Sequence, residues 1–233
     1  MRTSLTDFLL DVHYVCHFVP ETLFLTINVL DRYCSKRVVP VDHYQLAGCV
    51  ALLVAAKYVE QKDVVPTVWD LKTICCSLCE RHMFSRTKWA TLESSMFSQM
   101  EWAMLATLDW TVGRPTPADF LRLDLPEDGF DSGLGYLTRY ISETTLYHKC
   151  FVCVRPSVIA VSSVCLARYI LHGSNLSQCG IMPTSNLGVM INMLHHLKQP
   201  SHVIFNKYTS PDYSAVSIMV HGFLQPQRRE PPK

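Results

Sequence analysis

Apolar residues recur at helical spacing along most of the chain, and no segment shows the sustained alternation typical of a half-buried strand. Many of these segments begin at Pro, or at Ser, Thr or Asp, which commonly start helices. The predicted helices span residues 1–19, 20–36, 67–78, 87–108, 136–148, 156–171, 185–196 and 211–223, with further helices starting at Asp42 and after Thr116. The pattern therefore predicts an all-α protein.

The most strongly apolar stretch is Gln45–Glu60, in which every residue from Leu46 to Ala56 is apolar or glycine. A helix that is apolar on all sides belongs in the interior of a helical domain. The run is too short to cross a bilayer, which needs about 20 residues. Lys57 follows it directly. This lysine is therefore either an end group of the buried helix or a contact aimed at a partner.

Several helix ends carry recognisable capping residues. Asp42 is predicted to cap the apolar helix, with Gln45 three residues later completing a capping box. Thr116 and Ser210 each precede a proline and are predicted N-caps. Gly173 is predicted to end the helix that starts at Pro156.

Residues 124–135 interrupt the helical pattern, because they are acidic and contain three glycines. The predicted organisation is a first domain 1–123, a linker 124–135, a second domain 136–225 and a disordered polar tail 226–233. Both halves contain a helix begun by Pro with Leu, Arg and Tyr at the same offsets, in residues 20–33 and 156–169. This echo favours two similar helical domains in tandem.

Composition excludes several classes of function. The chain has 233 residues and a net charge of +1, without the basic footprint of a dedicated nucleic-acid binder. Carboxylates interrupt the apolar pattern of the N-terminal segment, which argues against a signal peptide. The sequence holds no Ser-His-Asp nucleophile motif, HExxH motif or phosphate-binding glycine loop. We therefore expect no catalysis by this chain alone.

The chain's ten cysteines are predicted to be reduced. Four lie in apolar helical patterns, where a thiol acts as a small hydrophobe: Cys16, Cys34, Cys49 and Cys165. The others considered for metal binding are Cys75, Cys76, Cys79 and His82, and the CxxC pair Cys150 and Cys153. Their spacing lacks the matched half-sites of a zinc centre. No metal or other cofactor is expected.

Several segments of the first half resemble the cyclin box in their order and approximate spacing. They are MRTSLTDFLLDVH, PETLFLTINVLDRY, YQLAGCVALLVAAKYVE, the helix end MEWAMLATLDW, and PTPADFL. The second half, through RPSVIAVSSVCLARYIL and NKYTSPDYSAVS, is similar to the C-terminal cyclin fold. The whole resembles fungal cell-cycle cyclins of the G1 or B class, and these segments do not separate the two classes.

The resemblance implies tandem five-helix cyclin folds. It implies binding to a cyclin-dependent kinase, reorientation of the kinase's regulatory helix and opening of its activation loop, which prepares the kinase for phosphoryl transfer. It also implies a location in the nucleus and cytoplasm, with no membrane or nucleic-acid partner. The family has a further helix upstream of the MRTSL segment, so we expect an N-terminally truncated piece of a longer chain.

The resemblance also implies a kinase-binding site. Lys57 and Glu101 match the lysine and glutamate with which cyclins contact the kinase beside its regulatory helix, and Tyr58 and Glu60 belong to the same site. Opposite charges on rigid helices can fix the register of a partner on a largely apolar surface. The alternative is an exposed Lys and Glu paired with each other, and the family match favours the kinase contact. The family has a further acidic residue where this chain has Val59, so one acidic residue of the family's site is absent here.

A substrate-docking groove is implied along the first helix. Its predicted residues are Met1, Leu5, Phe8, Asp11 and Gln45. In cell-cycle cyclins the matching stripe docks basic-x-leucine motifs of substrates and inhibitors, because an apolar trough beside a carboxylate suits a leucine flanked by Arg or Lys. The alternative is that the stripe belongs to the core and that Gln45 only completes the capping box. Ser4 and Phe8 depart from the family's aliphatic residue and Trp, so we expect a shallower groove.

Four charged residues are predicted to form structural ion pairs, namely Arg2, Asp7, Asp31 and Arg32. Removing one partner of a buried pair costs about 3–5 kcal/mol, so we expect such changes to damage folding more than recognition. Trp102 and Trp110 are assigned to packing, because aromatic residues at helical spacing more often belong to the core.

Two other functions fit tandem cyclin folds. One is a transcription initiation factor that contacts DNA, which requires a basic face that a net charge of +1 does not indicate. The other is a transcriptional cyclin paired with a different kinase. Such cyclins generally lack the MRxxL segment of the first helix, so its presence favours the cell-cycle class.

Overall fold

The computed structural model describes residues 1–78, 89, 92–125, 132–172 and 186–225, and these residues form helices and turns without a strand. This confirms the predicted all-α class. Within these ranges, no helix combines the length and the apolar character needed to span a membrane. The chain divides into two compact units, one formed by Met1–Asp119 with Leu146–Val154 and the other by Phe120–Thr145 with Arg155–Lys233.

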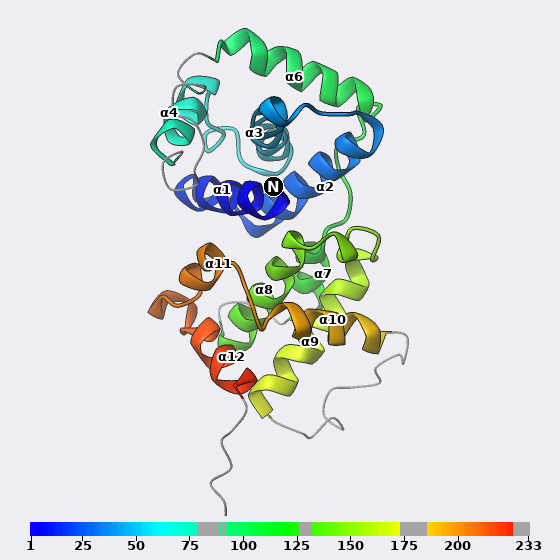
Figure 1. Cartoon of the computed structure of the whole chain (residues 1–233), viewed down its shortest axis with the longest axis vertical. Coiled ribbons are helices and arrows are strands. Elements are labelled where there is room, and N and C mark those ends of the chain that lie inside the picture. Colours follow the sequence, from blue (N-terminus) through cyan, green and yellow to red (C-terminus); the bar gives the residue numbers. More distant parts are fainter. Residues whose placement is uncertain (79–88, 90–91, 126–131, 173–185, 226–233) are drawn as a thin grey trace, which may run out of the picture. The chain divides into compact units, whose positions relative to one another are not determined.

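The described part of the first unit contains five helices. They are α1 (Arg2–Val15), α2 (Pro20–Lys36), α3 (Val41–Val59), α4 (Val68–Leu78) and α6 (Ser94–Thr107). Figure 1 shows α3 nearly end-on, with the other four helices around it. Every residue from Leu46 to Ala56 is buried, which confirms that this apolar run forms an interior helix.

Small residues on α3 allow close packing of its neighbours. A Cβ atom added at Gly48 would lie 3.0 Å from Cδ1 of Leu5, so the glycine allows α1 to approach α3 closely. Helix α1 ends at Val15, four residues before the predicted end at residue 19. His17 has a φ of 53°, and this left-handed residue turns the chain before α2 begins.

Two predicted helix starts in the first unit change in detail. The N-cap of α3 is Pro40, which makes no side-chain cap, and Asp42 lies inside the first turn, so Asp42 is not the N-cap residue. Helix α6 begins at Ser94 and not near residue 87, because the backbone of the preceding Glu93 is extended, with a ψ of 149°.

The predicted cap at Thr116 is confirmed. Its Oγ1 accepts a hydrogen bond from the Asp119 backbone N–H at 3.4 Å, and the Asp119 carboxylate accepts from the Thr116 N–H at 2.6 Å. These two reciprocal hydrogen bonds lie at the start of α7 (Pro117–Asp124). The boundary between the two units falls inside this helix, between Asp119 and Phe120.

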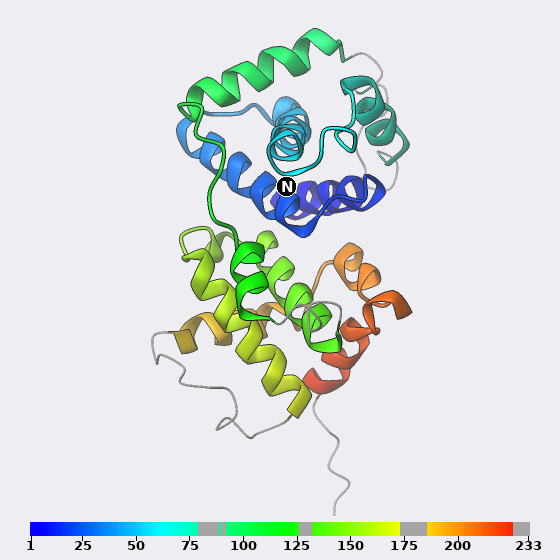
Figure 2. The ribbon, with the colours of Figure 1, turned by 180° about the vertical axis from the view of Figure 1, so that it is seen from behind.

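The second unit is built on two helices that contact each other, α8 (Gly133–Thr144) and α9 (Pro156–His172). Three shorter helices pack against them: α10 (Leu187–His196), α11 (His202–Lys207) and α12 (Val216–Leu224). Figure 2 shows α8 and α9 from the opposite side. Helix α8 begins within the segment predicted as a linker, where the Ser132 hydroxyl accepts from the Gly135 N–H at 3.3 Å.

The structure corrects two further predictions and shows one helix that the sequence did not predict. The predicted helix 136–148 ends at Thr144 and continues as the short 3₁₀ helices Thr145–Tyr147 and Lys149–Phe151. The predicted helix 211–223 is divided by Ser214 and Ala215, which are both left-handed. Helix α11 was not predicted, because six residues are too few to show a clear period.

The remaining predictions concern two helix caps and the C-terminal tail, and their outcomes differ. Ser210 accepts from the Asp212 N–H at 3.3 Å and is confirmed as a cap, here of the 3₁₀ helix Pro211–Tyr213. The predicted C-cap Gly173 and the predicted tail 226–233 lie outside the described residues.

A buried ion pair joins α8 to α11. The Lys207 ammonium donates to both carboxylate oxygens of Glu143, at 3.0 and 2.8 Å, and the two side chains are only 11% and 2% exposed. The neighbouring Tyr208 is fully buried, and burial together with the Glu143 charge raises the pKa of its phenol. A carboxylate this deeply buried requires its partner, because the charge has lost its water.

We predict that Lys207→Met destabilises the chain by about 3–5 kcal/mol, because it leaves Glu143 buried without its cation. Urea unfolding measures this loss. The exposed Lys198 provides the matched control, and Lys198→Met should change stability by less than about 0.5 kcal/mol. Equal effects of the two changes would contradict the assigned role of the pair.

Candidate functional site

Lys57 and Glu101 meet at the surface of the first unit. Lys57 lies in the last turn of α3, and its ammonium donates to both carboxylate oxygens of Glu101 on α6, at 2.6 and 2.9 Å. The side chains are 47% and 21% exposed. The structure therefore brings together the two residues predicted for kinase contact. An exposed pair of this kind contributes little to stability.

Exposed aromatic residues occur next to this pair in the sequence. Tyr58 is 63% exposed and Trp102 is 66% exposed, and they follow Lys57 and Glu101 directly. Trp110 is 64% exposed, so the assignment of both tryptophans to packing is wrong. The buried residues of α6, Phe97 and Met104, lie on the face opposite Trp102. Exposed aromatic side chains are enriched where proteins bind one another.

Gly113 gives Tyr58 its position. A Cβ atom at this glycine would lie 2.0 Å from the Tyr58 hydroxyl oxygen and 2.9 Å from Cε1 of its ring. The phenol therefore lies against the backbone that follows α6, and any larger residue would displace it. Sequence reasoning missed Gly113, because nothing in the chain pattern places it beside Tyr58.

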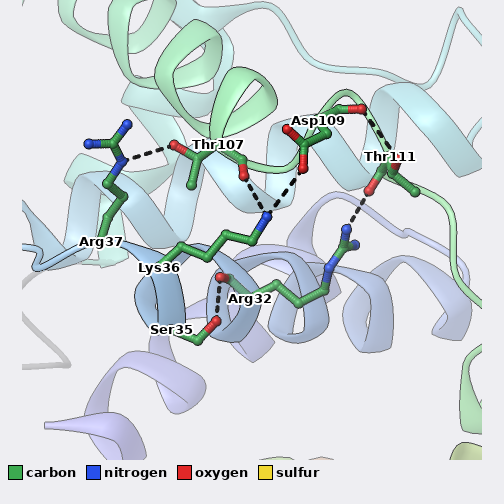
Figure 3. Close-up of polar contacts among 7 residues, drawn as sticks. All are labelled: Arg32, Ser35, Lys36, Arg37, Thr107, Asp109 and Thr111. Carbon is green, nitrogen blue, oxygen red and sulfur yellow. Dashed lines mark hydrogen bonds and ion pairs between the residues drawn. The ribbon is translucent and has the colours of Figure 1, made fainter.

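Basic side chains at the C-terminal end of α2, Lys36 and the C-cap residue Arg37, hold the C-terminal end of α6 (Figure 3). The Lys36 ammonium donates to the Thr107 carbonyl at 3.0 Å and to the Asp109 carboxylate at 3.3 Å. The Arg37 guanidinium donates from Nε to the Thr107 hydroxyl at 3.3 Å. Positive charge is favourable at this end of a helix, where backbone carbonyls lack partners. The turn carries Trp110, whose φ of 56° is left-handed.

Glu60 faces inward, toward the start of α2. Its Oε1 accepts from the Val19 N–H at 2.9 Å and from the Thr22 hydroxyl at 2.5 Å. These groups lie at the N-terminus of α2, where backbone N–H groups lack helical partners and favour a negative charge. Glu60 was predicted to contact the kinase, but in this structure its carboxylate caps a helix.

The predicted docking residues divide between the core and the surface. Leu5 and Phe8 are 2% and 0% exposed, so they belong to the core and do not line an open groove. Met1 is 62% exposed, and Asp11 and Gln45 are half-buried. The physical reason is the close approach of α1 to α3, which draws the apolar side of the stripe inward.

Comparison with known protein families decides what this arrangement is. The model of the cyclin N-terminal domain matches residues 1–113, and that of the cyclin C-terminal domain matches residues 115–222. The chain belongs to the cyclin family. Both predicted cyclin folds are thereby confirmed.

Relatives of this cyclin include cell-cycle cyclins of fungi. It is 36% identical to the G1/S-specific cyclin CCN1 of Candida albicans, over 83% of this chain and 28% of that protein. It is 29% identical to the G2/mitotic-specific cyclin-3 of Saccharomyces cerevisiae, over 96% of this chain and 51% of that protein. The chain thus spans between about a quarter and a half of the length of these relatives.

A solved structure supports the same fold. A viral cyclin from herpesvirus saimiri matches 96% of this chain and 83% of its own, with a TM-score of 0.57 and 17% sequence identity. This likeness concerns the arrangement of helices and extends to both halves of the chain.

The charged residues predicted as ion pairs have different partners. Arg2 on α1 forms a two-pronged ion pair with Asp31 on α2, in which Nη2 lies 2.9 Å from Oδ2. Its Nε also donates to the Leu146 carbonyl at 3.1 Å. Burial of the guanidinium opposes its charge, but Asp31 outweighs this and raises the pKa of Arg2. Asp7 accepts a hydrogen bond from the Tyr147 hydroxyl at 2.8 Å.

Arg32 is bound to backbone and not to a carboxylate in the part of the chain that the structure describes. It donates to the carbonyls of Thr111 and Val112, at 2.6 and 3.2 Å. Burial and the nearby positive charge of Arg114 lower its pKa. Arg32 therefore secures the segment after α6, where the sequence suggested an ion pair.

Metal binding has little structural support. Within the described ranges, no three His, Cys, Asp or Glu side chains are grouped so that they could hold a metal ion. Cys79 and His82 of the predicted cluster lie outside those ranges.

We predict that Glu60→Ala lowers stability by about 1–3 kcal/mol, because it leaves the start of α2 without its acceptor. Thermal or urea unfolding measures this loss. Asp63→Ala is the control, since Asp63 is exposed three residues later and should change stability by less than about 0.5 kcal/mol. If Glu60→Ala were as stable as the control, the wild-type Glu60 carboxylate would not be needed to cap α2 and would be available for a partner.

Proposed function

We propose that this cyclin binds and activates a cyclin-dependent protein kinase through the surface formed by Lys57, Tyr58, Glu101 and Trp102. The observation that carries the proposal is the ion pair of Lys57 and Glu101, which is held on the two packed helices α3 and α6. An exposed pair of this kind contributes little to stability, so the fold itself does not require it. The relatives' names, which are those of G1/S-specific and G2/mitotic-specific cyclins, support the same role. We place this function in the nucleus and cytoplasm.

The ion pair of Lys57 and Glu101 can form further hydrogen bonds with a partner without being broken. An ammonium has three donors, and Lys57 uses two of them on Glu101. Each carboxylate oxygen of Glu101 can accept a second hydrogen bond. A docked kinase helix can therefore bond to both side chains without separating them. This avoids the penalty for burying an unpaired charge.

The exposed aromatic residues supply the rest of the affinity. Tyr58 and Trp102 offer large apolar surfaces at low cost in side-chain entropy. Excluding water around the charged pair strengthens its interactions, because the local dielectric constant falls. The rigid helices then act as a fixed surface that shifts the kinase's regulatory helix toward its active position.

We predict that Lys57→Ala combined with Glu101→Ala weakens kinase binding by at least about 30-fold, which corresponds to about 2 kcal/mol. Kinase activation at cellular concentrations should be lost with it. Pull-down with candidate kinases and a phosphorylation assay measure both quantities, and thermal unfolding checks that the variant stays folded.

The matched control changes the neighbouring exposed pair of residues, Lys62→Ala with Asp63→Ala. Like the test variant, it removes one positive and one negative charge from the surface, and it should leave kinase activation unchanged. Normal activation by the Lys57 and Glu101 variant would show that the site assignment is wrong.

We also propose that this cyclin docks basic-x-leucine motifs of substrates or inhibitors, on a smaller surface than the sequence predicted. Met1, Asp11 and Gln45 remain at the surface, whereas Leu5 and Phe8 are buried. A carboxylate at Asp11 suits the basic residue of such a motif, and the exposed Met1 side chain suits its leucine.

We predict that Asp11→Asn raises the KM for a peptide substrate with this motif about threefold to tenfold and leaves kcat unchanged, because one charge contact of about 1 kcal/mol is lost. A peptide without the motif serves as the control and should show no change. Equal KM values for wild type and variant on the motif peptide would remove Asp11 from the docking surface.

A further inference from the structure

The turn that contains Cys150 and Cys153 carries two exposed cysteines. Both side chains are exposed and in the thiol form. The other six described thiols are buried or half-buried: Cys16, Cys34, Cys49, Cys75, Cys76 and Cys165. Among the described residues, these two are thus the thiols most accessible to a solute.

The two cysteines are about one turn of backbone apart, since Cys150 lies in a 3₁₀ helix and Cys153 follows the end of that helix by two residues. Lys149–Phe151 is a 3₁₀ helix, and Val152 continues the turn with a φ of −58° and a ψ of −37°. A 3₁₀ helix has three residues per turn and a rise of about 2 Å per residue, so side chains three apart eclipse with Cα atoms about 6 Å apart. A disulfide requires a Cα separation of about 4.4–6.8 Å. The expected Cα separation therefore lies in the disulfide range, and a small local shift of the turn would bring the two Cβ atoms to the shorter separation that the bond requires.

The residues around the thiols hold this turn in place. Tyr147 and Phe151 are 6% and 4% exposed, and the Tyr147 hydroxyl donates to Asp7 on α1. The Leu146 carbonyl accepts from Arg2, also on α1. Hydrogen bonds within the turn run from the N–H of Val152 and that of Val154 to carbonyls three residues earlier. Closing a disulfide would therefore add little to the ordering already present.

The less exposed thiols are less reactive than Cys150 and Cys153. Burial raises the pKa of Cys16 to about 11, and burial together with the neighbouring Cys49 raises the pKa of Cys75 well above its ordinary value. The thiolate is the reactive form, so these cysteines resist oxidation and act as packing groups. Cys49 and Cys75 touch at 3.5 Å but lie wholly inside the core.

We propose that Cys150 and Cys153 form a redox-modification site, which a small peroxide oxidises to an intramolecular disulfide. In the first step one thiol attacks the peroxide, whose O–O bond breaks to give a cysteine sulfenic acid and a molecule of water or alcohol. In the second step the other thiol attacks the sulfenic sulfur, the S–S bond forms and water leaves. Together the two cysteines lose two protons and two electrons, which reduce the peroxide. The site does not depend on kinase binding.

The test treats the native full chain with hydrogen peroxide, alkylates the remaining thiols and locates disulfides by mass spectrometry without reduction. In the wild type we expect Cys150 and Cys153 to be lost together as one intrachain disulfide. Cys150→Ser and Cys153→Ser should each abolish that bond and leave a single oxidised or alkylated thiol. Cys34→Ser, which changes a half-buried thiol, is the control and should behave as the wild type does.

A second measurement tests proximity without oxidation. A trivalent arsenical such as phenylarsine oxide bridges two neighbouring thiols, so the native wild type should bind one equivalent and each exposed-cysteine variant none at this site. Independent sulfenic acids or bonds between chains in place of the intrachain disulfide would overturn the proposal. So would arsenical binding that survives Cys150→Ser. Thermal unfolding of each variant should match the wild type, since both side chains are exposed.

Discussion

The burial of α3 on every side is the constraint on which the first unit depends. Its apolar run can be covered only by other helices, and α1, α2 and α6 all contact it. Polar groups on this helix are therefore confined to its ends. At the C-terminal end, Glu60 turns toward the start of α2 while Lys57 turns toward Glu101 and solvent. Two charges three residues apart thus serve opposite purposes, one inside the fold and one at its surface.

The rigidity of the proposed kinase surface comes from bonds to backbone more than from ion pairs. Lys36 and Arg32 bind carbonyls at and beyond the end of α6, and Gly113 lets Tyr58 lie against the same segment. Neutral carbonyls at a helix end are good partners for cations, because they lack other donors. The exposed Trp110 therefore sits on a turn that is tied to α2 at several points.

Accessibility also separates the cysteines by role. Cys16 and Cys75 are packed among apolar side chains, and burial keeps them protonated. Cys150 and Cys153 lie on a turn that is anchored by buried neighbours but leaves both thiols exposed. The same residue type thus acts as a hydrophobe in one place and as a candidate reactive pair in another, and the local environment alone makes the difference.

The sequence by itself determined the all-α class, the interior helix Leu46–Ala56 and the positions of Lys57 and Glu101, because helical periodicity and family motifs are local properties of the chain. It did not reveal that Phe8 is buried or that Trp102 is exposed, because the side of a helix that meets the core is decided by its neighbours. Nor did it assign Glu60 to the start of α2 or Arg32 to the carbonyls after α6. Those partners are 38 to 80 residues away in the chain, and only tertiary packing brings them within hydrogen-bonding distance.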